Sequence, residues 1–186
     1  NLASVTKEVK LMMDPDADPY AVPEEGEEAE VGKFGASEVT DLSWVQLMNA
    51  YTCTECGRCS SVCPANQTGK ELSPRAIMMK TRDRLEEVGR FIDKEGEAAF
   101  REKGDGKSLL DTISEAELWA CTSCNACVTE CPVSIDPLSI IMDMRRYLVM
   151  EQSAAPQELN LMMTNVENNG APWQYSQMDR LNWKDE

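Results

Sequence analysis

The sequence has 186 residues, enough for one domain with tails or for two small domains. Its net charge of −15 argues against a nucleic-acid partner, because nucleic-acid binding needs a basic footprint, and against direct adsorption to anionic lipid. The acidity leaves two interpretations open, a solvated surface or docking to a basic face of a redox partner.

Residues 1–39 predict an amphipathic start followed by an acidic linker. The start has apolar residues at Val5, Val9, Met12 and Met13, and the stretch from Asp14 to Glu30 mixes prolines with many carboxylates. No uncharged run exceeds 13 residues (Leu42 to Thr54), so no segment is expected to span a bilayer. The chain begins at Asn1 rather than Met, which is compatible with a preceding segment, including one with membrane helices.

Helical patterns dominate residues 40–155, which we assign to one domain. A first helix is capped by Thr40 or Asp41, and its buried face is expected to contain Leu42, Val45, Met48 and Tyr51. Further helices begin at Ser73-Pro74, at the capping box that Ser114 and Glu117 form, and at Asp136-Pro137. No alternating strand pattern is present, so the predicted fold class is all-α, with an irregular tail over residues 156–186.

An internal repeat carries the cysteines. The run Cys-x-x-Cys-x-x-Cys-x-x-x-Cys-Pro occurs twice, from Cys53 to Pro64 and from Cys121 to Pro132. Where the first copy has Gly57 the second has Asn125, and these residue types tolerate positive φ best. Both loops are therefore expected to turn left-handed there and to aim backbone N–H groups at bound sulfide.

This spacing predicts two [4Fe–4S] clusters. The short gaps let three thiolates converge on one cube, and the fourth cysteine before proline ligates the other cluster in two-cluster ferredoxins. The expected ligands of the first cluster are Cys53, Cys56, Cys59 and Cys131. Those of the second are Cys121, Cys124, Cys127 and Cys63. The crossed arrangement would also fasten the two ends of the core together.

Other uses of the cysteines fit the pattern less well. Structural zinc sites pair two Cys-x-x-Cys units across a longer loop and lack the trailing Cys-Pro. Disulfides suit small secreted chains, and triplets this closely spaced pair poorly. The chain has no histidine, no G-x-G-x-x-G and no P-loop, so we predict no catalytic residue and no nucleotide or flavin site.

Two residues near the motifs admit alternative interpretations. Arg58, inside the first loop, is either an ordinary surface arginine or a group that raises a cluster potential or docks a partner. Trp119, two residues before Cys121, is expected to shield the second cluster by packing, with electron relay as the alternative.

The double cysteine motif in a helical frame resembles the α-helical dicluster ferredoxin module of the heterodisulfide reductase C/D-like iron–sulfur proteins, a family that includes bacterial iron–sulfur oxidoreductase subunits. The run from Thr52 to Arg75 and the tail segment from Asn165 to Trp173, followed by Arg180 and Trp183, support the resemblance. The tail has Ala171 where the family pattern has Asn.

The resemblance implies an electron-transfer subunit, non-catalytic by itself, in a membrane-associated oxidoreductase complex at the cytoplasmic side of the inner membrane. Its partners would be a protein with a Cys-Cys-Gly domain, to which residues 156–186 would dock, and a haem-containing membrane domain or subunit. The alternative is a structural or assembly module without redox turnover. An iron–sulfur protein of the succinate-dehydrogenase type would need a Cys-x4-Cys-x2-Cys run before Cys53, and none is present.

Overall fold

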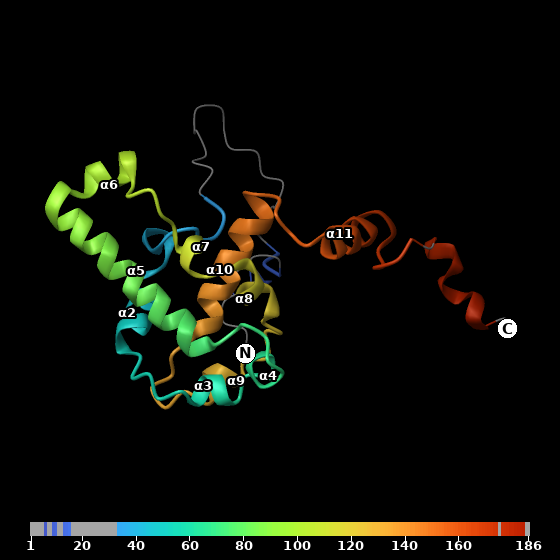
Figure 1. Ribbon diagram of the computed structural model, residues 1–186. Coiled ribbons are helices and arrows are strands. Elements are labelled where there is room, and N and C mark those ends of the chain that lie inside the picture. The colour runs from blue at the N-terminus through green and yellow to red at the C-terminus, as the bar shows by residue number, and fades with distance from the viewer. Residues whose placement is uncertain (1–5, 7–8, 11–12, 16–32, 175, 185–186) are drawn as a thin grey trace. The chain divides into compact units, whose positions relative to one another are not determined.

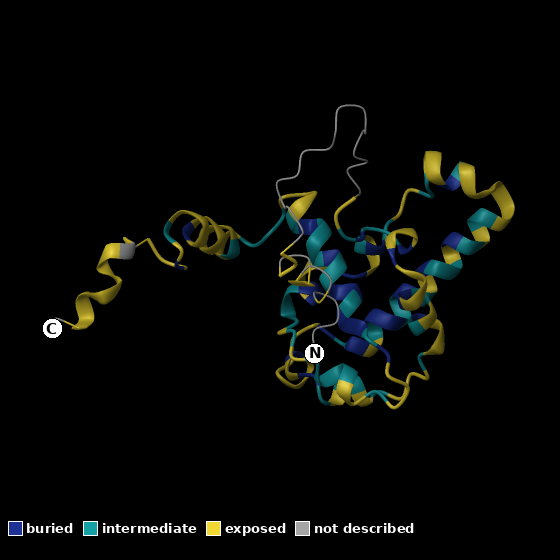
Figure 2. Cartoon of the chain, turned by 180° about the vertical axis from the view of Figure 1, so that it is seen from behind, coloured by how far each residue is buried: buried dark blue, intermediate teal, exposed yellow. Residues whose placement is uncertain are grey.

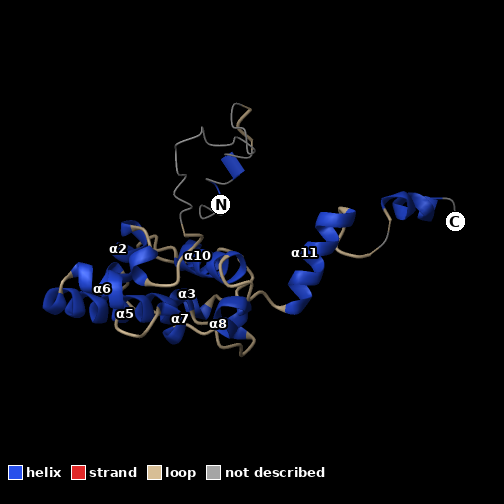
Figure 3. Cartoon of the chain, turned by 90° about the horizontal axis from the view of Figure 1, so that it is seen from above, coloured by secondary structure: helices blue, strands red, loops and turns tan. Residues whose placement is uncertain are grey.

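The computed structural model describes residues 6, 9–10, 13–15, 33–174 and 176–184. Within these ranges the chain contains helices and no strand (Figure 3), which confirms the predicted all-α class. Most of the predicted acidic linker, together with Val5 and Met12, lies outside the described residues. No helix in the described ranges is both long enough and apolar enough to cross a bilayer.

The chain divides into two compact units, residues 1–147 and 148–186, and each is described by itself. The predicted limits 1–39, 40–155 and 156–186 stay a prediction. The elements shown in Figure 1 are, in chain order, η1 (Val39–Asp41), α2 (Trp44–Thr52), α3 (Arg58–Ser61), α4 (Pro64–Gln67), α5 (Pro74–Glu95), α6 (Glu97–Lys103), α7 (Leu109–Thr112), α8 (Glu115–Ala120), α9 (Ala126–Thr129), α10 (Pro137–Met150), α11 (Gln157–Asn169) and η2 (Gln177–Lys184).

The predicted start of α2 was wrong. Ser43 is its N-cap: the Ser43 hydroxyl accepts from the Gln46 N–H, and the Gln46 side chain accepts from the Ser43 N–H at 2.8 Å. Thr40 and Asp41 belong to the short helix η1, which Glu38 caps. Ser43 displaces them because the Ser-x-x-Gln spacing satisfies two terminal N–H groups at once.

The predicted buried face of α2 was confirmed at Leu42, which is buried just before the helix, and was wrong at its other three positions. Val45, Met48 and Tyr51 are 42, 47 and 53 % exposed, whereas Gln46 and Ala50 are buried. The amide of Gln46 donates to Asp143 of α10 at 2.7 Å, and this bond fixes which side of α2 faces inward.

The other predicted helix starts are confirmed. Ser73 caps α5 with Pro74 at its first position, and Ser114 and Glu117 form the capping box of α8. At the start of α10 the Ser139 N–H donates to Asp136 at 3.1 Å. The core contains the buried side chains of Ile77, Met78, Val88, Leu109, Ile113, Leu118, Leu138, Ile140, Ile141, Met144 and Leu148.

Residues just before η1 pack closely on α10. The Ala36 N–H donates to the Asp143 carbonyl at 3.0 Å, and Ala36 and Val39 are both buried. Gly35 has φ +76, and a Cβ there would lie 2.2 Å from the Asp143 carbonyl oxygen and 2.4 Å from the Tyr147 nitrogen. Only glycine permits this approach, so Gly35 seats the segment against α10.

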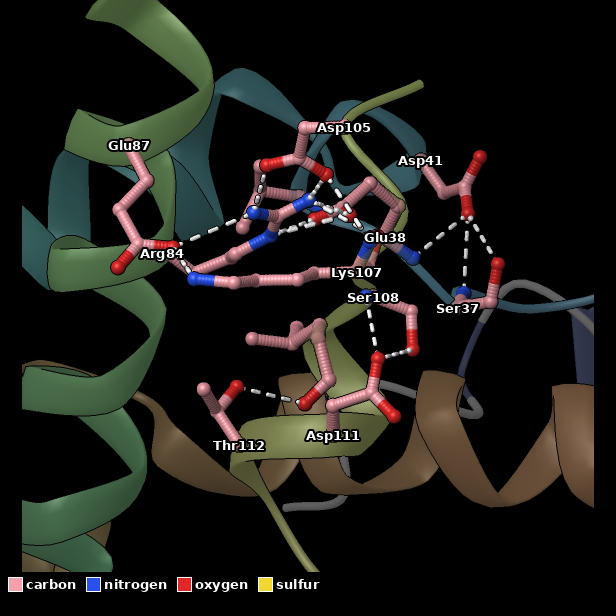
Figure 4. A network of polar contacts seen from close by, with 12 residues as sticks. Ser37, Glu38, Asp41, Arg84, Glu87, Asp105, Lys107, Ser108, Asp111 and Thr112 are labelled. Carbon is pink, nitrogen blue, oxygen red and sulfur yellow. Dashed lines mark hydrogen bonds and ion pairs between the residues drawn. The ribbon is translucent and has the colours of Figure 1, made fainter. Parts of the chain in front are cut away.

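A buried arginine holds the far half of α5 to the loops around it (Figure 4). The Arg84 side chain is inaccessible to solvent; it donates to Glu38 at 2.6 Å, to Asp105 at 2.7 Å and to the Lys107 carbonyl at 3.0 Å. Hydrogen bonding to this guanidinium lowers the pKa of Asp105 to about 2. The network joins α5 to the start of η1 and to the loop after α6.

The second unit contains a helix that the sequence did not predict. Helix α11 ends at Gly170, whose φ of +63 gives a left-handed cap. Asn165, which is buried, donates to the Pro172 carbonyl at 3.1 Å and folds the Gly-Ala-Pro-Trp segment back against the helix. Many large apolar side chains of this unit are exposed, among them Leu161, Val166, Trp173, Met178, Leu181 and Trp183.

Candidate functional site: two cysteine-lined cavities

The two cysteine loops adopt the same backbone path. Gly57 and Asn125 have φ +80 and +62, which confirms the predicted left-handed turns, and each is the N-cap of a four-residue helix, α3 or α9. Two positions before them, Glu55 and Ser123 also have positive φ, 57 and 55. The sequence did not show this second pair, because neither residue type marks a left-handed position. Helices α3 and α9 lie side by side (Figure 1), so the loops face one another.

The eight cysteines gather around two cavities. The first cavity is lined by Cys53, Cys56, Cys59 and Cys131. The second is lined by Cys63, Cys121 and Cys124, and Cys127 lines both. Each run therefore sends its fourth cysteine to the cavity of the other run. In the described residues no group of three or more Cys, Asp or Glu forms a site for a single metal ion.

The surroundings of the cysteines change the pKa values of their thiols. Burial raises the pKa of Cys59 and Cys121, and that of Cys127 to about 12. These thiols would stay protonated by themselves, whereas coordination to a metal deprotonates a thiol outright. Cys56 is exposed, and the backbone N–H of Arg58, with the Arg58 charge, lowers its pKa. The residues present fit two [4Fe–4S] clusters, each of which would supply one-electron redox chemistry when bound.

Backbone donors are already directed at two of the sulfurs. The Ser123 N–H donates to Cys121 Sγ at 3.4 Å, and the Ile135 N–H donates to Cys131 Sγ at 3.3 Å. Hydrogen bonds to the ligand sulfurs are one of the means by which a protein sets the potential of an iron–sulfur cluster.

An arginine that the sequence reasoning missed supports the second loop. Arg145 of α10 is half-buried and donates to the Leu118 carbonyl at 2.9 Å and to the Cys121 carbonyl at 2.6 Å. Its guanidinium also lies 5.0 Å from the centre of the Trp119 ring. The sequence signal for this role was the position of Arg145 on the same helix face as the apolar residues Ile141, Met144 and Leu148. At the first loop, Arg82 of α5 instead forms an ion pair with Glu55 at 2.8 Å.

Trp119 and Arg58 occupy different kinds of position. Trp119 is half-buried beside the second loop, and its buried Nε1–H has no acceptor within the described part of the chain. Its shielding of a cluster stays a prediction. Arg58 is exposed at the start of α3, with its charge next to Cys56, so the structure leaves room for a role at the cluster or at a partner.

The fold and the two cavities together define a two-cluster iron–sulfur protein of the electron-transfer class. Residues 52–135 match the model of the 4Fe-4S dicluster domain, and this match confirms the two-cluster prediction. These residues include all eight cysteines of the two runs.

Several curated relatives are similar over most of this chain. A probable iron-sulfur-binding oxidoreductase of Bacillus subtilis, FadF, is 36 % identical over 82 % of the chain and 25 % of its own length. The EtfAB:quinone oxidoreductase of Syntrophomonas wolfei is 35 % identical over 86 % of the chain and 24 % of its length. The chain thus spans about a quarter of the length of these relatives.

The resemblance to heterodisulfide reductase is confirmed at a greater distance. A heterodisulfide reductase C-like protein of Archaeoglobus profundus is 27 % identical over 68 % of this chain, and the match covers 54 % of that protein.

Proposed function

We propose that the chain relays single electrons through two [4Fe–4S] clusters with crossed ligands. Cys53, Cys56, Cys59 and Cys131 hold one cluster, and Cys121, Cys124, Cys127 and Cys63 hold the other. The observation that carries the proposal is the pair of cavities that share Cys127, because it brings the two ligand sets next to one another. Adjacent clusters can pass electrons between partners without a substrate site in this chain.

The chain acts within a heterodisulfide-reductase-like oxidoreductase complex at the cytoplasmic face of the inner membrane. The names of its relatives support this assignment: one is an oxidoreductase of EtfAB and quinone, and another is heterodisulfide reductase C-like. Quinones are lipid-soluble, so a relay to or from them works beside a membrane. Electrons enter from a flavoprotein or a haem-containing membrane domain and leave to a protein or domain with Cys-Cys-Gly motifs, or they flow in the opposite direction.

The second unit is the proposed contact for that Cys-Cys-Gly partner. Among its described residues, Trp173 is 54 % exposed and Trp183 is 70 % exposed. Aromatic anchors dominate interface energetics, so Trp173→Ala should weaken association by roughly 2 kcal/mol or more. Co-purification with the partner, with iron assayed in both forms, tests this contact. Unchanged partner recovery, or loss of partner and iron together, would show that the tail only packs.

Electrochemistry of the anaerobically reconstituted chain tests the relay. A relay protein with two cubane clusters should contain about eight iron and eight sulfide per chain and should take up about two electrons reversibly. A structural or assembly module would bind the same iron but would not exchange electrons reversibly at accessible potentials. Stoichiometric zinc, or an EPR spectrum fitted by a [2Fe–2S] centre alone, would contradict the cluster assignment itself.

A further inference from the structure

Helix α2 turns its apolar side outward. Trp44, Met48 and Tyr51 recur at helical spacing on one face and are 72, 47 and 53 % exposed. The opposite face buries Gln46 and Ala50, and the Gln46–Asp143 hydrogen bond holds that orientation. A helix that points its polar face inward and three large apolar side chains at solvent presents an interaction surface.

The apolar stripe on α2, formed by Trp44, Met48 and Tyr51, ends close to the first cavity. Tyr51 is two residues before the half-buried Cys53, and Thr54, Glu55 and Cys56 are exposed. Figure 2 shows the burial along the chain. Val133, which is 49 % exposed, lines the same cavity. A protein that covered the stripe would lie next to Cys56, a ligand position of the first cavity that reaches solvent.

The charge around this loop is opposite to that of the whole chain. Arg58 and Arg75 are exposed, and neither has a carboxylate partner among the described residues. Arg82 is engaged by both nearby carboxylates, Glu55 at 2.8 Å and Asp83 at 3.6 Å. Within the described ranges, Arg58 and Arg75 are therefore two unpaired cations beside the loop, on a protein of net charge −15. A docking partner would therefore match the loop with carboxylates.

The second loop lacks these features, although Cys124 is also exposed. Ser123 and Asn125 are uncharged, and the preceding helix α8 buries Leu118 and Glu117. In the described residues α8 has no exposed large apolar side chain. The two loops therefore differ in what surrounds the exposed cysteine, and the first loop is the better place for a partner to deliver electrons.

We propose that the α2 stripe (Trp44, Met48 and Tyr51) together with the Cys53–Arg58 loop is the docking surface for a redox protein that presents carboxylates around an apolar centre. This inference rests on the relay function proposed above. In the contact, the reduced partner loses one electron and the cluster of the first cavity gains it, with no bond made or broken. Aromatic side chains anchor the contact, and the arginines steer its formation.

The test uses reduced flavodoxin, a small acidic one-electron carrier, as the probe, with the reconstituted two-cluster chain as acceptor. Two net-acidic proteins should repel, so the transfer rate would rise with added salt if overall charge governed docking. The proposed surface predicts the opposite, a rate that falls as ionic strength increases. A rate that rises with salt for the unaltered protein would overturn the proposal.

Charge reversal locates the contact. Arg58→Glu with Arg75→Glu should lower the transfer rate about tenfold at low salt and reverse its salt dependence. Arg90→Glu with Arg101→Glu makes the same change in net charge at two arginines that are 76 and 78 % exposed on α5 and α6, and should leave the rate within about twofold. Equal effects of both pairs would overturn the proposal, because overall charge would then explain them.

Removal of the aromatic side chains tests the apolar part. Trp44→Ala with Tyr51→Ala should lower the rate at every salt concentration, whereas Met13→Ala, at a side chain that is 78 % exposed outside both proposed contacts, should not change it. Iron content and electrode reduction are measured for each variant. Normal reduction at the electrode with no effect of any substitution would refute the docking surface and leave the relay intact; absence of electrode reduction would refute the relay itself.

Discussion

The two halves of the first unit have the same cysteine loop in different surroundings. Both loops share positive φ at two matched positions, yet Pro64 and Pro74 are ten residues apart, whereas Pro132 and Pro137 are five apart. The added residues form α4 and its following turn. An arginine supports each loop, but Arg82 is paired with a carboxylate, whereas Arg145 donates to main-chain carbonyls. The comparison shows that the ligand geometry repeats and the electrostatics do not.

The largest expected effect comes from breaking the exchange of cysteines between the halves. Under crossed ligation, Cys53→Ala with Cys131→Ala damages one cluster and leaves about four iron atoms per chain. Cys53→Ala with Cys63→Ala damages both clusters and leaves iron near zero. Iron and sulfide analysis after anaerobic reconstitution gives the answer. If each run held its own cluster, the two double variants would give the reverse result.

The next effect concerns Arg84, which holds the long α5 of the first half. Arg84→Gln leaves Glu38 and Asp105 without their buried cation and should lower the free energy of unfolding by about 3 kcal/mol. The control is Arg90→Gln, whose exposed ion pair with Glu86 should contribute less than about 0.5 kcal/mol. Chemical denaturation measures both; a similar loss in the two variants would contradict a structural role for the network.

The same network predicts a pH dependence. The Asp105 carboxyl has its folded pKa lowered to about 2 from 3.8, so its contribution to stability is fully present above about pH 4 and is lost as the pH falls toward 2. Arg84→Gln should abolish this part of the acid dependence, since the carboxyl then titrates near its ordinary pKa in both states. The difference in denaturation midpoint between the two forms should accordingly shrink from pH 5 to pH 2.5.

A substitution at Gly35 tests how closely the segment before η1 packs against α10, which belongs to the second half. Gly35→Ala places a Cβ within 2.4 Å of two main-chain atoms of α10 at φ +76, and should destabilise the protein by about 3 kcal/mol. Gly69→Ala is the matched control, because Gly69 has φ +78 but no atom within 4 Å of the added Cβ. It should lose only about 1 kcal/mol from backbone strain. Equal losses would mean that strain, and not close packing, matters at Gly35.

The smallest effect concerns the cluster potentials. It compares the arginines beside the two cysteine loops directly. Arg145→Gln removes a half-buried cation next to Cys121 that has no carboxylate partner among the described residues, and should lower one midpoint potential by roughly 50 mV. Arg82→Gln should shift a potential less, since Glu55 already offsets its charge. Redox titration followed by EPR measures both. A larger shift for Arg82→Gln would contradict the asymmetry between the halves.

The sequence alone determined the parts of this protein that local chemistry fixes. The all-α class, the two clusters and the helix starts at Ser73, Ser114 and Asp136 followed from spacing and capping, because a cap bonds N–H groups a few residues away. The turns at Gly57 and Asn125 followed from the φ range that these two residue types tolerate. Each of these features depends on neighbours in the chain, and a pattern of neighbours is what a sequence displays.

Only the tertiary structure decided which side of α2 faces inward. Its apolar spacing predicted that Val45, Met48 and Tyr51 would be buried, but Gln46, which donates to Asp143 97 residues away, lies on the inward face instead. The closeness of Gly35 to α10 and the support of Cys121 by Arg145 likewise join segments far apart in the sequence. Such contacts depend on where distant elements meet in space, and helical periodicity carries no information about that meeting.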